Sequence, residues 1–164
     1  MPSNNDNVFN FEWEGFEEFR DLIDGLEDEF YKIAKEEYTK YGMLLEEGTK
    51  ALAPVDEGNL EDSINFITKR EGNSIVIEGG SNLEYALRRH EEPYRMGKHP
   101  KYDNGSKFPD YYKDGRGRET RAKGTWRGMQ SGRKFLTNAV ILTEEDWNTM
   151  NRRIIQRLFG GGDG

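Results

Sequence analysis

Apolar residues recur at every third or fourth position from about Glu12 to Lys50, which is the spacing of one buried face of an α-helix. Pro54 ends this pattern, because the residue before a proline is pushed out of the α-helical region. The pattern therefore predicts one long N-terminal helix. The apolar stripe consists of Phe16, Phe19, Ile23, Leu26, Phe30, Ala34, Tyr38, Tyr41 and Leu45.

A different periodicity follows the proline. Residues 64–70 and 74–79 alternate between two faces, and Glu71-Gly72-Asn73 between them has the composition of a tight turn. These features predict an antiparallel hairpin. The next segment, residues 83–91, fits a short helix or a strand equally well.

Apolar character returns at residues 134–142, and Thr143 has the composition of a helix start. The spacing beyond it predicts a C-terminal amphipathic helix. Residues 1–11, which are rich in Asn, are expected to be disordered, and residues 160–164, which are almost all glycine, are expected to form a flexible tail. The stripe of the C-terminal helix consists of Trp147, Met150, Ile154 and Leu158.

The segment from Glu92 to Lys134, called the basic arm below, contains no Leu, Ile or Val. It carries twelve Lys or Arg against five Asp or Glu, although the whole chain has a net charge of −7. A packed core needs apolar side chains, so the arm is expected to lie outside the core and to contact something else. The residues that we expect to make this contact are Arg95, Lys98, Lys101, Lys107, Lys113, Arg116, Arg118, Arg121, Lys123, Trp126 and Arg127.

Three interpretations of the arm remain open. Basic and aromatic side chains together bind phosphates and stack on bases, so the arm could contact DNA. The same residue types concentrate at protein interfaces. We favour a protein partner, because the chain as a whole is acidic. The third interpretation is a flexible loop, although a 43-residue insertion is unusual in a compact domain unless it has a function.

Length and composition predict a single domain over residues 12–159, with the arm (92–134) inserted in it. The chain has no cysteine, so disulfides and thiol chemistry are excluded. Residues 1–12 lack the basic and apolar regions of a signal peptide, and no apolar run is long enough to cross a membrane. We therefore expect no membrane partner.

Catalytic chemistry finds little support in the sequence. His90, Glu91 and His99 lie close together in the chain, but their spacing matches no zinc-binding pattern. No phosphate-binding loop, dinucleotide motif or nucleophile elbow is present. We expect no cofactor, no metal and no catalytic residue, and we interpret His90 and Glu91 as residues that hold the root of the arm by hydrogen bonds.

Three short motifs occur in order along the chain. They are APVDEGNLEDSI (Ala53 to Ile64), EYALRRHEE (Glu84 to Glu92) and GRKFLTNAV (Gly132 to Val140). Together they resemble the HK97 gp10-like proteins of tailed bacteriophages, which are head–tail joining or tail-completion proteins and are sometimes described as minor capsid proteins. Glu57 stands where that family usually has threonine, and the basic arm is longer than the family's usual connection.

The resemblance implies an α+β fold in which a long N-terminal helix packs on a small antiparallel sheet, followed by a C-terminal helix, with the basic arm as a long extended loop. It also implies a homo-oligomeric ring, commonly a hexamer, at the neck of the virion, and no enzymatic activity. The motif residues expected to form the core or its turns are Pro54, Val55, Asp56, Gly58, Leu60, Ser63, Ile64, Tyr85, Ala86, Phe135, Leu136 and Ala139.

Three functional hypotheses follow. In the first, the protein is a structural neck protein between the head connector on the portal side and the tail, made in the host cytoplasm, and its arm becomes ordered on assembly. In the second, the arms line the channel of such a ring and contact the genomic DNA. In the third, the protein is a metal-dependent enzyme that processes nucleic acid through His90, Glu91 and His99.

Overall fold

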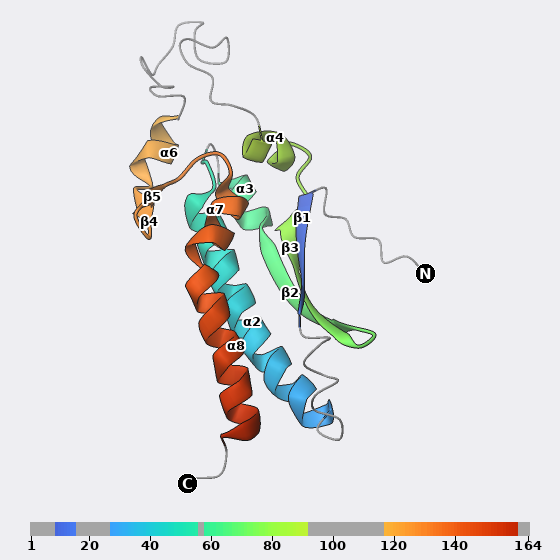
Figure 1. Ribbon diagram of the computed structural model, residues 1–164. Helices are drawn as coiled ribbons and strands as arrows, with labels where there is room; N and C mark the ends of the chain where they lie inside the picture. Colours follow the sequence, from blue (N-terminus) through green and yellow to red (C-terminus); the bar gives the residue numbers. More distant parts are fainter. Residues whose placement is uncertain (1–8, 16–26, 56–57, 92–116, 161–164) are drawn as a thin grey trace, which may run out of the picture.

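The computed structural model describes residues 9–15, 27–55, 58–91 and 117–160, with only the backbone for residues 9–15 and 118 (Figure 1). A three-stranded antiparallel sheet forms one layer, and the helices α2 and α8 form the other. Short helices and a second, two-stranded sheet cluster at one end of these layers. The predicted α+β class is confirmed.

The long helix α2 spans Glu27–Leu52. Its first turn holds three acidic residues, which the positive end of the helix dipole favours. The predicted apolar stripe is buried from Phe30 to Leu45, and its earlier members lie outside the described residues. The helix ends two residues before Pro54, as the proline predicted.

The predicted hairpin is formed by β2 (Asn65–Glu71) and β3 (Ser74–Ser81). Gly72 in its turn has a φ of 57°, which glycine adopts without strain. β3 is the central strand, in the order β1-β3-β2, and all eight of its residues are buried.

The first strand, β1 (Phe9–Gly15), was not predicted. It pairs antiparallel with β3, from Phe9 opposite Ser81 to Gly15 opposite Ile75. The sequence predicted disorder through residue 11 and a helix from Glu12, and both predictions are wrong for these residues. The segment FNFEWEG alternates aromatic and polar residues with the period of two that is typical of a strand.

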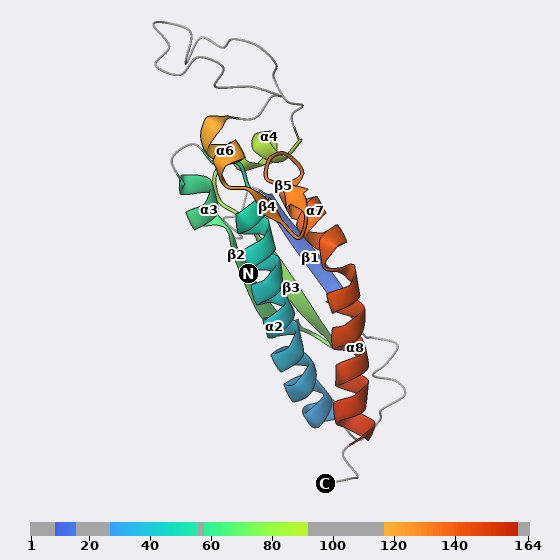
Figure 2. The same cartoon turned by 90° about the vertical axis from the view of Figure 1, so that its left-hand side faces the viewer.

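Two C-terminal helices, α7 (Phe135–Leu142) and α8 (Glu144–Phe159), follow each other closely and both pack on α2. Figure 2 shows α8 running antiparallel beside α2, with the sheet behind them. The first core cluster lies between these helices and the sheet. Its buried members are Phe30, Tyr31, Ile33, Ala34, Tyr38, Tyr41, Leu45, Ile75, Ile77, Met150 and Ile154.

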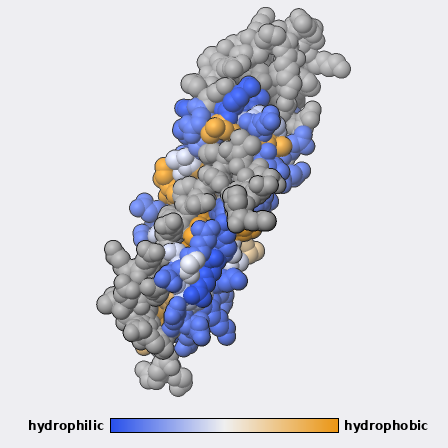
Figure 3. Space-filling view, turned by 90° about the vertical axis from the view of Figure 1, so that its right-hand side faces the viewer, coloured by the Kyte–Doolittle hydropathy of each residue, from blue (hydrophilic) through white to orange (hydrophobic). Residues whose placement is uncertain are grey.

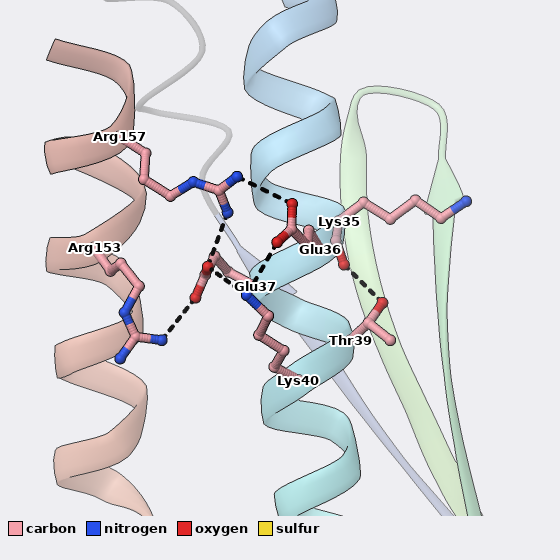
Figure 4. Close-up of polar contacts among 7 residues, drawn as sticks. All are labelled: Lys35, Glu36, Glu37, Thr39, Lys40, Arg153 and Arg157. Atoms are coloured by element: carbon pink, nitrogen blue, oxygen red, sulfur yellow. Dashed lines mark hydrogen bonds and ion pairs between the residues drawn. The ribbon is translucent and has the colours of Figure 1, made fainter. Parts of the chain in front are cut away.

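A layer of charged residues joins α2 to α8 beside this cluster (Figure 4). Glu37 is buried, and its carboxylate accepts hydrogen bonds of 2.9 Å from each of Arg153 and Arg157 and of 3.1 Å from Lys40. Burial favours the neutral acid, but the hydrogen bonds from these three cations outweigh it and lower the pKa of Glu37. The carboxylate is therefore ionised at neutral pH and holds the two helices together.

The face of the molecule on the right-hand side of Figure 1 is mostly polar where the structure describes it. Figure 3 shows mostly hydrophilic side chains on the described part of this face, with small and separate hydrophobic patches. Ile67 on β2 is one exposed apolar residue of the sheet, with 55% of its surface accessible. Isolated exposed apolar residues are normal on a protein surface and indicate no docking site by themselves.

Candidate functional site: the base of the basic arm

The C-terminal part of the basic arm folds against the rest of the chain. It contains α6 (Arg118–Ala122), β4 (Thr125–Trp126) and β5 (Met129–Gln130). The sequence predicted that the whole arm lies outside the core, and for residues 117–134 this prediction is wrong. Residues 92–116 lie outside the described residues.

One tryptophan explains how a segment without aliphatic residues packs. The ring of Trp126 lies on α2 at Gly48, so close that a methyl group added to this glycine would be only 2.5 Å from the ring. The indole Nε1–H also donates to Glu47 at 3.3 Å. A large aromatic ring buries as much surface as an aliphatic side chain, and the glycine provides the space for it.

The turn between β4 and β5 has a strained residue at its tip. Arg127 has a φ of 49° and is followed by Gly128 at 83°, the left-handed pair that a two-residue hairpin turn requires. Its guanidinium donates to Asp146 at 2.5 and 3.3 Å and to the carbonyl of Leu142 at 3.0 Å. Arg127 therefore ties the hairpin to the corner between α7 and α8, which compensates for the strained backbone.

Lys123 caps the C-terminal end of α2. Its ammonium group donates to the carbonyl of Lys50 at 2.5 Å and to that of Ala53 at 2.9 Å, and it forms an ion pair with Glu61. The last carbonyls of a helix have no partner within the helix and carry partial negative charge, so a cation is favoured there. The described part of the arm thus donates to backbone carbonyls at and just after the end of α2.

The helix α6, which follows residues 92–116 in the chain, and the residues after β5 are anchored by hydrogen bonds to the end of α2 and the turn after it. The backbone N–H of Val55 donates to the Thr120 hydroxyl at 3.0 Å, and that hydroxyl lies 3.2 Å from the Val55 carbonyl. Ser131 donates to the Thr120 carbonyl at 2.7 Å, and the Gly132 N–H donates to the Leu52 carbonyl at 2.8 Å. We call this set of contacts the Thr120 anchor.

The other end of residues 92–116 follows α4 (Ala86–Glu91), which resolves the open choice for residues 83–91 in favour of a helix. His90 is 2% exposed, and its Nδ1 lies 2.7 Å from the Glu91 carboxylate. Its Nε2 faces Thr137 in the first turn of α7, and its carbonyl accepts from the Lys134 N–H at 2.9 Å. We call this set of contacts the His90 anchor.

The His90 anchor also includes contacts from two basic residues to Glu91. The ammonium group of Lys134 pairs with the Glu91 carboxylate, and Arg133 donates to the Glu91 carbonyl at 2.9 Å. The hydrogen bond from Lys134 is the main cause that lowers the pKa of Glu91. Burial is the main cause that lowers the pKa of His90, so the imidazole is neutral at neutral pH. The interpretation that His90 and Glu91 hold the root of the arm agrees with this geometry.

The two anchors surround the second core cluster, which collects residues from all three sequence motifs. Ser63 in this region donates to the Leu60 carbonyl at 2.7 Å and lies 2.6 Å from the Ser81 hydroxyl. The ring of Phe135 packs edge-on against His90 at 5.0 Å. The buried members are Leu52, Ala53, Leu60, Ile64, Ala86, Phe135, Leu136 and Ala139.

Other motif residues occupy different environments. Pro54, Val55 and Gly58 are partly buried at the turn between α2 and α3 (Asn59–Ser63), and Asp56 lies outside the described residues. Tyr85 is 39% exposed, so the prediction that it closes the core is wrong. It lies in the turn before α4, and the small side chain of Ala86 fills the core position instead.

Some of the arm residues that we expected to make a contact are described by the structure, and the others are not. Arg121, Lys123, Trp126 and Arg127 are described, and the last three contact other elements of the chain as above. Arg118 begins α6, but its side chain is not described. The others lie outside the described residues and comprise Arg95, Lys98, Lys101, Lys107, Lys113 and Arg116.

Within the described ranges, no group of three His, Asp or Glu residues is arranged to hold a metal ion. His99, the third member of the hypothetical metal site, lies outside those ranges. None of the described helices is both long and apolar enough to cross a membrane.

Comparison with known proteins gives one family match. Residues 17–87 match the family described as "Bacteriophage HK97-gp10, putative tail-component". The predicted resemblance to this family is confirmed. The match includes the first motif and the beginning of the second, and the third motif lies beyond it. No curated protein and no solved structure matches the chain.

The family that residues 17–87 match is thus described as a component of phage tails. The structure adds a point that the match does not include. Phe135, Leu136 and Ala139 of the third motif pack in the same cluster as Leu60 and Ile64 of the first. The three motifs therefore form one structural unit.

Proposed function

We propose that this protein is a structural neck protein of a tailed bacteriophage, which assembles as a ring, commonly a hexamer, between the head connector and the tail. It acts by binding its neighbours, in the virion and during assembly in the host cytoplasm, and it catalyses no reaction. The family match supports the virion location.

The observation that carries the proposal is the location of the motif cluster. The second core cluster, built from all three motifs, lies between the His90 anchor and the Thr120 anchor. Residues 92–116 thus begin and end on the part of the molecule where the family motifs meet. We propose that this segment contacts a neighbouring subunit or an adjoining ring of the virion. Ordering a flexible segment costs about 1–2 kcal/mol per residue, so such a contact must be extensive.

Limited proteolysis tests the proposal. In the isolated protein, trypsin should cleave between Arg95 and Arg116, and this cleavage should disappear in assembled particles. Lys123 and Arg127 serve as an internal control, because their contacts with α2 and α8 should protect them in both states. Equal cleavage between Arg95 and Arg116 in the two states would contradict an assembly role for the arm.

Charge reversal distinguishes a protein partner from DNA. Substitution of Arg116, Arg118 and Arg121 by Glu should prevent attachment of tails to heads if the arm contacts protein. If the arms instead line a DNA channel, rings should form normally and the particles should lose their genome. Normal rings and normal DNA retention would exclude both contacts for these three residues.

A further inference from the structure

His90 makes a different contact through each of its ring nitrogens. Nδ1 lies 2.7 Å from a Glu91 oxygen, and a carboxylate at neutral pH can only accept, so the proton of the neutral ring is on Nδ1. Nε2 then carries a lone pair. It lies 3.4 Å from the backbone nitrogen and 3.3 Å from the hydroxyl of Thr137.

Thr137 stands at a point where the backbone needs an acceptor. It lies in the first turn of α7, whose leading N–H groups have no acceptor within the helix. Lys134, the residue at the N-terminal cap, has a left-handed backbone and no capping side-chain hydrogen bond. The neutral imidazole of His90 supplies the missing acceptor from a separate element, α4.

We propose that His90 is a proton-sensitive latch, whose ring accepts the Thr137 N–H and so strengthens the contact between α4 and the start of α7 only while it is neutral. Protonation places a second N–H at Nε2, which then faces the N–H of Thr137 and can no longer accept. The charged ring would also be buried against Phe135, in a site with 2% exposure.

The charges around the ring do not offset this loss. Glu91 attracts the protonated ring, but Lys134 already pairs with that carboxylate. Lys134 and Arg133 repel a charged imidazole, and burial further opposes its protonation. Acid therefore weakens the contact between α4 and α7.

The latch acts on α4 and does not involve the Thr120 anchor. The Thr120 anchor consists of hydroxyl and backbone groups, none of which titrates between pH 5 and 8. Mild acid would thus loosen α4 and leave α6 fixed by the Thr120 anchor. This inference concerns the arm that the proposed function places at an interface, but it is a property of the isolated chain and is tested without virions.

Nuclear magnetic resonance of the wild-type imidazole nitrogens provides the direct test. We expect His90 to carry its proton on Nδ1 and to titrate below the ordinary pKa of 6.5. The chain has two histidines, so the variant His99→Ala assigns the signals and should leave those of His90 unchanged. A His90 proton on Nε2 at neutral pH, or a His90 pKa of 6.5 or above, would overturn the latch.

Amide hydrogen exchange provides the structural readout. Protection at Thr137 and in α4, relative to Ile154 in α8, should fall on going from about pH 7.5 to about pH 5, by up to about tenfold per pH unit below the pKa of His90. In His90→Gln, whose side-chain oxygen accepts at every pH, this relative protection should not change with pH. An equal loss of protection in this variant would contradict the proposal. If the variant does not fold, the wild-type titration still decides.

Discussion

Two regions of the molecule are stabilised in different ways. The body holds the first core cluster, and the motif end holds the second core cluster with the two anchors. In the body, α2, α8 and the sheet enclose large side chains such as Tyr38 and Ile77. At the motif end, the core residues are fewer, and side chains such as Lys123 and His90 satisfy backbone groups of other segments. Regular elements can be stabilised by burial, whereas short irregular segments depend on partners for their polar backbone. Substitutions in the two regions should therefore have effects of different size and extent.

The largest effect is expected in the body. Ile77→Ala removes a fully buried side chain and leaves a cavity, so it should lower the free energy of unfolding by about 3–4 kcal/mol. Ile67→Ala is the matched control on the neighbouring strand, where the side chain is 55% exposed, and it should cost less than about 1 kcal/mol. Denaturant titration measures both. Similar losses for the two variants would contradict the assignment of the core.

The ion cluster between α2 and α8 gives the next effect. Glu37→Gln removes the buried carboxylate that Arg153 and Arg157 contact and should cost about 2 kcal/mol at neutral pH. Glu36→Gln, which changes an exposed neighbour on the same helix, should have a smaller effect. Thermal unfolding of the two variants at one pH makes the comparison.

The same carboxylate predicts a pH dependence. The folded pKa of Glu37 is lowered from the ordinary 4.5, so its contribution is full above that value and is lost as the pH falls through the folded pKa. Wild-type protein should therefore lose more stability than Glu37→Gln below about pH 4.5. Parallel acid curves for the two proteins would show that the ion cluster does not stabilise the fold.

At the motif end, removal of the lysine that caps α2 should have a smaller and more local effect. Lys123→Met keeps the apolar part of the side chain but leaves the carbonyls of Lys50 and Ala53 without this partner, at a cost of about 1 kcal/mol. Amide exchange should increase near the end of α2 and in α6 and stay unchanged in α8. Lys35→Met, at an exposed position of the same helix, is the control and should have no effect.

The smallest net effect on stability is expected from alanine substitutions of two glycines of α2. Gly42→Ala should stabilise the protein by about 0.5–1 kcal/mol, because the added methyl group has room and alanine favours helix. In Gly48→Ala the same gain is offset by displacement of Trp126. The indole N–H resonance of Trp126 should shift in Gly48→Ala and remain in place in Gly42→Ala. An unchanged resonance in Gly48→Ala would contradict the packing of the hairpin on α2.

Periodic segments were predicted well from the sequence. The C-terminal helix and the β2–β3 hairpin follow patterns in which neighbouring residues alone indicate the buried face. The strand β1 was missed because its alternation is short and lies beside a helical pattern that dominated the interpretation. Within the candidate site, the role of His90 and Glu91 at the root of the arm was predictable from their position before the aliphatic-free segment.

The packing of residues 117–134 could not be predicted in the same way. A segment without aliphatic residues has no periodic apolar signal, and its docking depends on Gly48, a position about eighty residues earlier in the chain. Likewise, nothing near Glu37 in the sequence indicates that its partners are Arg153 and Arg157. Such pairs are decided by how the elements pack.

The sequence by itself determined the α+β class, the position of the hairpin and C-terminal helix, and the resemblance to the phage family, because these depend on local periodicity and on short motifs. Only the tertiary structure decided that β1 joins the sheet and that Trp126 and Lys123 dock on α2. It also decided that His90 caps a helix of another motif. The physical reason is that burial and backbone hydrogen bonding are satisfied in space, by groups that are distant along the chain.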